Sequence, residues 1–421
     1  MLVENQYPRD TRVRNEATAL VSRGLRVTVI ALGGPGEPRR EVVNGVTVYR
    51  LPRLTVFKKL PDTERSGLLA IAVKVRVLIG YAAEYLYFTL GCLAYSTCVA
   101  GKEGFDVIHA HNPPDTLFIV GAVYKAFGKK FVFDHHDLSP ELYRSRYSSP
   151  SGVVTRGLAI CEKASVKLAD VLIATNESYR DIDIRRNGID PSRVFIVRNG
   201  PDLARVRLTE PDEALRSRAR IVLGYLGAMN PQDGVDYMLR ALHHLRYPLE
   251  RSDFHAVVIG DGDSLEELRS LSAELGLADC VTFTGFIPDE DMVRLLSTVD
   301  VCLDPNPSSP LNDVSTWIKV MEYMALGKPL VSFGLKETRV SAGEAALYAT
   351  PNDVEEFARA VARLMDDEPL RRSMGQAGRR RVEERLNWAV TSQNLVAAYQ
   401  RLFPGWAADV SSARAGDRVP A

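Results

Sequence analysis

The chain has 421 residues, of which 46% are hydrophobic and 25% are charged. This length exceeds the size at which a single hydrophobic core stops growing, so we expect two globular domains. The 53 basic and 53 acidic residues cancel, and a net charge of zero gives no electrostatic ground for a nucleic-acid-binding protein. The five cysteines are scattered and odd in number, which favours free thiols in a reducing, cytoplasmic compartment.

Short apolar runs alternate with amphipathic helical runs through most of the sequence. The runs are rich in Val and Ile and are continuous rather than alternating, which is typical of parallel strands covered on both faces. We predict strands at residues 26–32, 106–111, 130–137, 171–176, 194–200, 221–227, 255–262, 280–285, 301–305 and 328–333, and a hairpin at residues 41–51. The opening residues, MLVENQ, leave room only for a stub of a first strand. The pattern predicts an α/β protein with two doubly wound, Rossmann-like domains.

The alternation pauses in the polar stretch at residues 201–220. We therefore place a domain boundary near residue 205, with an N-terminal domain at 1–205 and a C-terminal domain at 206–386. Ligands of such sheets bind beyond the carboxyl ends of the strands, so we expect a site in the cleft between the domains. The tail at 405–421 is poor in apolar residues and is predicted to be disordered.

A long apolar stretch occupies residues 77–101, with Glu84 as its one charged residue and Lys74 and Arg76 just before it. Its length would suffice for a membrane-spanning helix, but a glutamate within a bilayer is costly. A packed core helix is favoured. A helix lying in the plane of the membrane surface, with Lys74 and Arg76 near the headgroups, is the alternative that stays open. It would place the protein at the inner face of the membrane.

Residues 311–333 read LNDVSTWIKVMEYMALGKPLVSF and predict a helix that runs into a buried strand. Ser315 is the expected N-terminal cap and Gly327 the expected stop. Lys319 and Glu322 share one face of this helix. A loop entering a helix offers free N–H groups to an anion, a lysine adds a charge, and a glutamate can accept two hydroxyl hydrogen bonds. A core helix without a ligand is the alternative interpretation.

Four histidines fall at two predicted strand ends, in HAHN and DHHD. His109 and His111 share a face of their strand. With a nearby aspartate they could bind a metal, so a metal-dependent hydrolase that uses His109, His111 and His136 is an alternative function. Buried structural histidines are the simpler interpretation of His109 and His135.

The segment MEYMALGKPLV resembles the donor-binding motif of retaining glycosyltransferases of family 4, which have the two-domain GT-B fold. Other segments resemble that family in the same order along the chain: DVIHAHNPPDTL, FDHHDLSPELY, FIVRNGPDL, LGYLGAMNPQDGVDYMLRAL, VVIGDGDSLEEL, VTFTGFIPDEDM and LNWAVTSQNLVAAYQRLF. The resemblance implies a final helix at 387–404 that crosses back to the first domain. It also implies a UDP- or GDP-linked sugar donor, a sugar or lipid-linked acceptor, retention of configuration, and no cofactor or metal.

The resemblance assigns roles to individual residues. Glu322 would bind the donor ribose, and His136 would lie against the donor sugar. Lys319, whose charge lies near the expected anion site at the helix start, is our first candidate for stabilising the diphosphate. We take these three residues as catalytic. Further donor-binding candidates are Gly227, Asn199, Asp313, Ser315 and Thr316.

Three positions depart from the family pattern. Val314 stands where the family has a second glutamate, and Ala228 and Asp233 stand where it often has an arginine and a lysine. The glycine-rich acceptor loop is also absent, as in one branch of the family, and an arginine cluster takes its place. We predict that Arg12 supplies part of the missing charge; a solvated helix start is the alternative. A catalytically silent scaffold with the same fold is the alternative for the whole chain.

Overall fold

The computed structural model describes residues 1–54, 68–146 and 150–406, with the side chains of residues 68–78 and 146 left out. Most of the predicted tail and the side chains of Lys74 and Arg76 therefore lie outside the description. The chain forms two compact units, one of Met1–Val197 with Ser392–Ala421 and one of Arg198–Thr391. The division falls a few residues before the predicted boundary at 205. The segment at 201–220 is thus part of the second unit.

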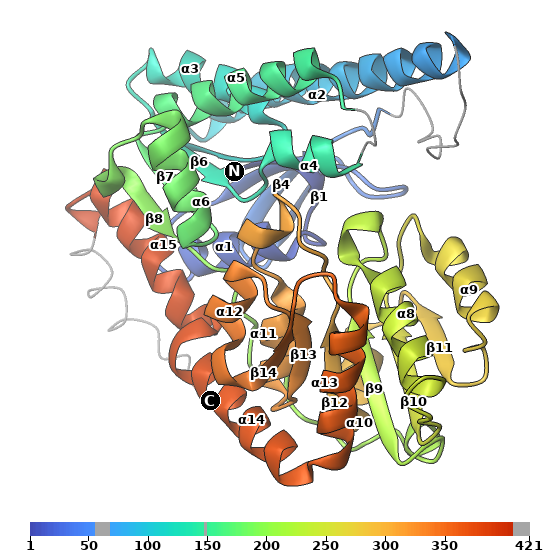
Figure 1. Ribbon diagram of the computed structural model, residues 1–421. Coiled ribbons are helices and arrows are strands. Elements are labelled where there is room, and N and C mark those ends of the chain that lie inside the picture. Colours follow the sequence, from blue (N-terminus) through green and yellow to red (C-terminus); the bar gives the residue numbers. More distant parts are fainter. Residues whose placement is uncertain (55–67, 147–149, 407–421) are drawn as a thin grey trace, which may run out of the picture. The chain divides into compact units, whose positions relative to one another are not determined.

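The first unit is built on an eight-stranded sheet (Figure 1). Its strand order is β3 (Arg40–Val43), β4 (Val46–Leu51), β2 (Thr28–Leu32), β1 (Leu2–Gln6), β5 (Val107–His111), β6 (Lys130–His135), β7 (Val171–Ala174) and β8 (Val194–Ile196). All neighbours are parallel except the β3–β4 hairpin, which turns at Asn44 and Gly45 with positive φ angles of 51° and 78°. The prediction of a stub at the start was wrong, because β1 has five residues and lies between β2 and β5.

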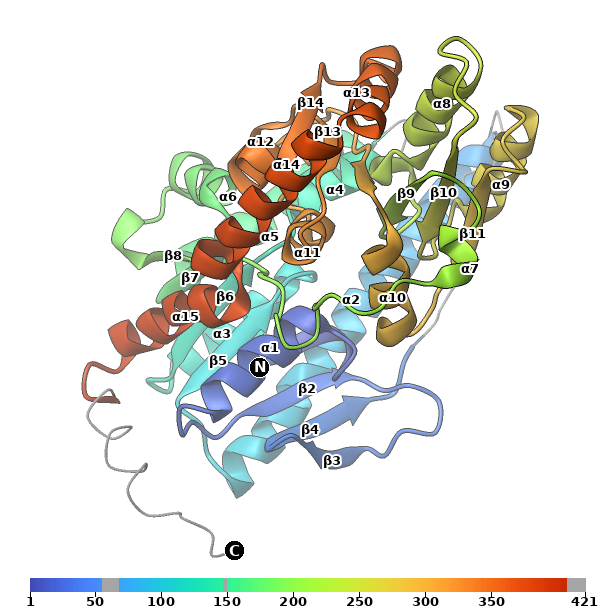
Figure 2. The same cartoon turned by 90° about the horizontal axis from the view of Figure 1, so that it is seen from below.

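Helices cover both faces of the first sheet. Those of this unit are α1 (Thr11–Val21), α2 (Leu68–Lys102), α3 (Phe118–Lys125), α4 (Ser139–Arg146), α5 (Gly152–Leu168), α6 (Glu177–Ile182) and most of α15 (Trp388–Leu402). Figures 1 and 2 show α2, α3 and α5 together on one face and α1 and α15 on the other. Within the described residues, no helix combines the length and the apolar composition that crossing a bilayer requires.

The second unit has a six-stranded, fully parallel sheet. Its order is β11 (Val281–Gly285), β10 (Phe254–Ile259), β9 (Ile221–Leu226), β12 (Val301–Asp304), β13 (Leu330–Phe333) and β14 (Ala346–Ala349). The helices are α7 (Glu213–Arg216), α8 (Val235–Arg246), α9 (Leu265–Glu274), α10 (Asp289–Thr298), α11 (Ile318–Ala325), α12 (Lys336–Ala342), α13 (Val354–Asp366) and α14 (Glu368–Arg381).

Successive strand residues in this sheet point to opposite faces, as the period of two requires. Leu223 packs in a core cluster with α8 and α13, whereas its neighbour Val222 packs in a second cluster with α10 and α11. Burial on both faces explains why the strands read as continuous apolar runs. The prediction of two doubly wound α/β units is therefore confirmed. Strand β14 escaped prediction, because Ala346–Ala349 is short and half alanine.

Candidate functional site

The start of α11 in the second unit differs from the predicted one. A 3₁₀ turn at Asn312–Val314 precedes it, and the helix begins at Ile318. Ser315 was predicted to cap the helix, and this was wrong: its hydroxyl donates to the Leu311 carbonyl oxygen at 2.8 Å, and Trp317 is the residue before the helix. The predicted stop is confirmed, since Gly327 follows the helix end with φ of 64°.

Lys319 is the second residue of α11 and is almost buried. Its Nζ is 3.5 Å from Asp304 Oδ1 and lies over the rings of Tyr225 and Trp317, at 4.8 and 5.2 Å from their centroids. Burial raises the pKa of the Asp304 carboxyl, and Lys319 opposes this rise. An ammonium group has three donors, so one distant carboxylate leaves it able to bind a second anion.

Gly227 brings the loop after β9 against this lysine. Its φ is 149°, and a Cβ atom there would lie 3.1 Å from Tyr225 Oη and 3.6 Å from Lys319 Cδ. A side chain at this position would crowd the Tyr225 hydroxyl and touch Lys319. The glycine therefore allows the backbone to approach Lys319 closely, as a loop that carries a ligand beside the lysine requires.

Glu322 follows Lys319 on the same helix face and is also nearly buried. Its Oε1 accepts a hydrogen bond from Arg205 Nη2 at 2.6 Å, and Arg205 Nη1 is 3.0 Å from Asp289 Oδ2. Burial raises the pKa of the Glu322 carboxyl, while Arg205 lowers it. Sequence reasoning missed Arg205 because it lies in the stretch interpreted as a linker.

The remaining donor-binding candidates lie around the start of α11. Thr316 Oγ1 accepts from Arg198 Nη1 at 3.3 Å, and Asn199 is half-buried directly after this arginine. The Asp313 carboxylate accepts from Ser308 Oγ at 3.0 Å, so it holds the loop before the helix. Arg198 was also missed by sequence reasoning, although it lies within the quoted segment FIVRNGPDL.

The departures from the family pattern have structural roles. Asp233 closes a capping box, in which its Oδ2 accepts from the Asn230 backbone N–H at 3.0 Å. The Ala228 carbonyl oxygen accepts from Tyr225 Oη at 2.7 Å. Val314 ends the 3₁₀ turn before α11. These residues fix two loops of the second unit and present no positive charge to a phosphate.

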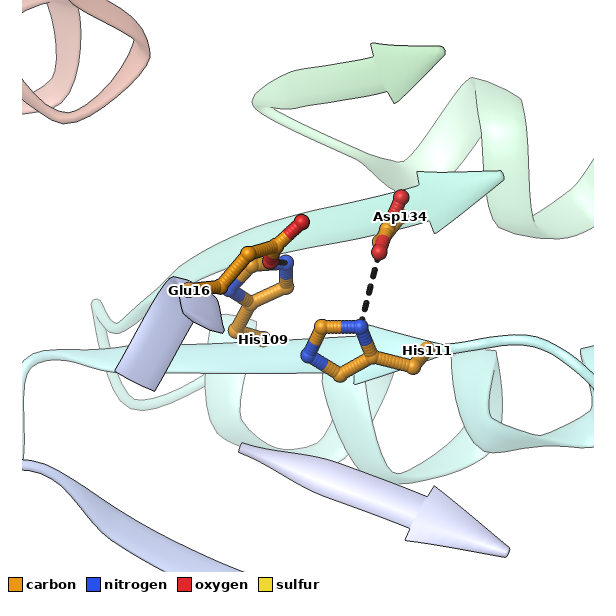
Figure 3. Close-up of side chains that lie close together, drawn as sticks. All are labelled: Glu16, His109, His111 and Asp134. Carbon is orange, nitrogen blue, oxygen red and sulfur yellow. Dashed lines mark hydrogen bonds and ion pairs between the residues drawn. The ribbon is translucent and has the colours of Figure 1, made fainter. Parts of the chain in front are cut away.

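A second group of polar side chains lies in the first unit, where α1, β5 and β6 meet (Figure 3). Glu16, His109, His111 and Asp134 are all buried, and four of their ligand atoms lie within 4.8 Å of one another. His111 Nδ1 is 2.8 Å from Asp134 Oδ2, and His109 Nε2 is 3.7 Å from Glu16 Oε2. His136, named in the metal hypothesis, is not a member of this group, whereas Glu16, which sequence reasoning missed, is.

Arg12 supplies a positive charge to this group. Its Nε and Nη2 each donate to an oxygen of Asp134 at 2.6 Å, and Nη2 is 3.2 Å from Glu16 Oε1. The Nη1 group donates to the Val197 carbonyl oxygen at 3.0 Å. Arg12 is therefore a buried, paired residue and not a solvated helix start. The predicted role of Arg12 at a phosphate would require these bonds to break.

The same contacts weigh against a metal in the group. A cation would face a guanidinium that already binds both oxygens of Asp134. Burial, with Asp134 nearby, raises the pKa of Glu16 well above its usual value, and burial lowers the pKa of His109. Burial thus favours the neutral forms of Glu16 and His109. The positive charge of Arg12 offsets the negative charge of Asp134, so this carboxylate offers little uncompensated charge to a metal ion.

His136 lies directly after β6, with a half-buried ring. Its backbone N–H donates to Asn112 Oδ1 at 3.0 Å, and its Nδ1 is 3.4 Å from Asp134 Oδ2. Burial disfavours the protonated ring, but the Asp134 carboxylate outweighs burial and raises the pKa of His136. Arg12 and His111 hold this carboxylate in place, so they position His136 indirectly.

His135 points to a different environment from its neighbour. Its Nδ1 is 2.8 Å from Asp183 Oδ1, and its Nε2 is 3.7 Å from Glu162 Oε2. Burial opposes protonation of this ring, but the two carboxylates raise its pKa to about 10. His135 is therefore a charged residue of the core, in agreement with the structural interpretation.

Comparisons with known proteins identify both units. Residues 10–200 match the family described as "Glycosyl transferase 4-like domain", and residues 220–367 match "Glycosyl transferases group 1". The D-inositol 3-phosphate glycosyltransferase of Acidothermus cellulolyticus is 26% identical over 409 residues, which cover 90% of this chain and 85% of that protein.

Solved structures agree on the fold. Sucrose-phosphate synthase from Thermosynechococcus elongatus is similar with a TM-score of 0.71 and 19% identity, covering 96% of this chain and 95% of that one. Anabaena HepE in complex with UDP-glucose is similar with a TM-score of 0.66 and 16% identity, covering 95% and 98%. Two matched glycosyltransferase domains on two Rossmann-like units show that this chain belongs to the superfamily of GT-B glycosyltransferases.

Proposed function

We propose that the protein transfers a sugar from a UDP- or GDP-linked donor to an acceptor hydroxyl with retention of configuration. The proposal depends mainly on the placement of Lys319 and Glu322 on the same face of α11. The loop at Gly227 lies beside Lys319. One group offers positive charge and the other offers carboxylate oxygens, which are what a diphosphate and a ribose require. The UDP-glucose bound by HepE supports the same donor class.

The donor would be held by the second unit. Lys319 would donate to the diphosphate, together with the N–H groups of the first turn of α11, which no side chain caps. Glu322 would accept from the ribose hydroxyls, and Arg205 would favour its ionised form by lowering its pKa against the effect of burial. Thr316 adjoins the same helix start, and Asn199 follows Arg198, which donates to Thr316. Asp313 and Ser315 support the loop in front of the helix.

The reaction would break the bond between the anomeric carbon and the diphosphate oxygen. The acceptor oxygen would form the new bond on the same face of the sugar, and its proton would pass to the departing diphosphate oxygen. Lys319 would stabilise the charge that develops on this leaving group. Asp134 is a poor nucleophile, because Arg12 and His111 occupy its oxygens. A covalent glycosyl-enzyme is therefore not part of the proposal, and trapping one would contradict it.

The first unit would supply His136 on the sugar side. The pKa of this ring is raised by Asp134, so it can donate a hydrogen bond to a sugar hydroxyl or carry positive charge near the leaving group. The acceptor is proposed as a sugar or a lipid-linked sugar of glycoconjugate or polysaccharide synthesis. The named activity of the Acidothermus relative, on D-inositol 3-phosphate, supports a hydroxyl acceptor.

The test is the melting temperature with UDP, GDP, ADP or dTDP, for the parent and Glu322→Ala. A ligand at a hundred times its dissociation constant stabilises by about 2.7 kcal/mol, so the correct base should raise the melting temperature clearly. Glu290→Ala, which removes an exposed carboxylate from α10, is the matched control. We expect a rise with one base in the parent and control, and none with Glu322→Ala.

The opposite result is equally clear. If no nucleotide raises the melting temperature of the parent, the donor site is not functional and the catalytically silent scaffold becomes the better interpretation. If a nucleotide stabilises Glu322→Ala as well as the parent, the binding site lies away from α11.

A further inference from the structure

Exposed hydrophobic side chains are concentrated on one helical layer of the first unit. Among the described residues, fifteen large hydrophobic side chains are exposed, and eight of them belong to α2, α3, α5 or the turn after α3. The eight are Ile79, Leu86, Leu90, Ile119, Val123, Phe127, Val153 and Ile160. Single exposed hydrophobic residues are normal on a protein surface, but a concentration of them marks an interaction site.

The stripe on α3 shows that this concentration follows helix geometry. Its exposed residues are Ile119, Ala122, Val123, Ala126 and Phe127, which recur at the spacing of a helix face. The opposite face of α3 is buried and also apolar. A helix that covers a sheet normally has polar residues on its outer face. Its apolar outer face therefore serves a purpose other than packing against the sheet.

The neighbouring helices extend the stripe into a surface. In α2, the exposed Leu86 and Leu90 lie one turn apart, while Phe88 between them is buried. In α5, Val153 and Ile160 lie two turns apart on the exposed face. Helix α3 contacts both α2 and α5, and all three lie on the same face of the sheet (Figures 1 and 2). Their outward stripes thus form one apolar face.

The charges on this apolar face have one sign. Arg156, Lys163 and Lys167 are exposed along α5, between and beyond Val153 and Ile160. Among the described side chains, the exposed stripes of α2, α3 and α5 contain no aspartate or glutamate. Apolar residues interleaved with Lys and Arg are typical of surfaces that lie in the interface of anionic membranes. A second copy of the chain would bring the same cations together, which disfavours self-association.

We propose that the apolar face of α2, α3 and α5 docks onto the surface of an anionic lipid bilayer. The exposed hydrophobic side chains would enter the headgroup region, and Arg156, Lys163 and Lys167 would contact lipid phosphates. The helices would lie on the membrane and not cross it. This inference goes beyond the proposed function, because lipid binding at this face requires neither the donor nor Lys319 and Glu322.

The experiment is flotation of the full chain with vesicles of phosphatidylcholine alone or mixed with phosphatidylglycerol. One variant combines Leu86→Ser, Val123→Ser and Phe127→Ser, and a second combines Arg156→Gln, Lys163→Gln and Lys167→Gln. The control combines Phe286→Ser and Val340→Ser, which remove exposed hydrophobic side chains of the second unit.

We expect the parent and the control to float with the anionic vesicles. The charge variant should bind these vesicles about a hundredfold more weakly, because each cation near an anionic surface contributes roughly a factor of five. The apolar variant should lose binding by at least about tenfold, since each buried apolar side chain adds to insertion. Absence of parent binding to either vesicle would overturn the proposal, as would equal losses in the control.

Two further measurements separate the other outcomes. Sedimentation velocity without lipid reports self-association; a parent that dimerises and an apolar variant that does not would assign the face to a second copy and overturn lipid docking. The melting temperature with and without nucleotide reports the donor site. If nucleotide raises the melting temperatures of the apolar and charge variants as it does that of the parent, both variants are folded. A failure of lipid binding is then distinguishable from a failure of the proposed function.

Discussion

Both units place charged side chains where central parallel strands end, but the two sets differ in how completely they are paired. In the first unit, Asp134 receives two hydrogen bonds from Arg12 and one from His111. In the second unit, the nearest carboxylate to Lys319 is 3.5 Å away. Completely paired, buried charges define a structure, whereas a charge with unused donors can bind a ligand. The difference separates residues that support the site from residues that form it.

Arg12→Ala should have the largest effect, and the effect should be on stability. Removal of one partner from a buried ion pair leaves an uncompensated charge and costs about 3–5 kcal/mol. Urea unfolding of the variant should therefore show a lower free energy of unfolding than the parent. Arg9→Ala, which removes an exposed arginine three residues before Arg12, is the control. If Arg12→Ala were as stable as the parent but bound UDP more weakly, Arg12 would belong to the ligand site and would contact a phosphate.

Lys319→Met should act on binding. Loss of a hydrogen bond to a charged group costs roughly 1.5–3 kcal/mol, so affinity for UDP should fall about 10–100-fold. Uridine, which has no phosphate, should bind the variant and the parent equally. Calorimetric titration with both ligands measures this difference. Equal losses for UDP and uridine would show that Lys319 supports the site without touching the diphosphate.

His135 should make the free energy of unfolding depend on pH. Its pKa in the folded protein is about 10, above the ordinary value of 6.5, so the folded state binds its proton more tightly. The stabilisation is fully present below pH 6.5 and is lost as pH rises towards 10, by about 1.4 kcal/mol for each pH unit.

Denaturation of the parent and His135→Gln across this range is the measurement. The parent should lose stability with rising pH more steeply than the variant. Parallel curves for the two proteins would show that His135 is neutral in the folded state.

Arg205→Gln should have the smallest effect. A partly exposed ion pair contributes up to about 1 kcal/mol, and without it burial would raise the pKa of Glu322 further. The protonated carboxyl is a weaker acceptor, so nucleotide affinity of the variant should fall severalfold at low pH and recover as pH rises. Asp289→Asn removes a carboxylate that raises the pKa of Glu322, so this variant should not lose affinity at low pH as Arg205→Gln does. Tighter binding by Arg205→Gln would instead show that Arg205 competes with the ligand for Glu322.

Structural features that depend on local periodicity could be predicted from the sequence. Continuous apolar runs located the strands, and the spacing of Lys319 and Glu322 placed them on one helix face. It did not reveal the partners of these residues, because Arg205 and Glu322 are 117 positions apart and Arg12 and Asp134 are 122 apart. Ser315 was misassigned because its hydroxyl bonds to the preceding turn, a choice that its residue type leaves open.

The division of the first unit bears on how the chain is made. The unit combines Met1–Val197 with a segment from Ser392 onwards, and Tyr399 Oη of that segment lies 3.0 Å from His109 Nδ1. A ribosome delivers the whole second unit before this tyrosine emerges. Until α15 is synthesised, the first unit lacks its last helix, and His109 lacks its contact with Tyr399. The second unit consists of one uninterrupted segment, so it can complete its fold before the first unit does.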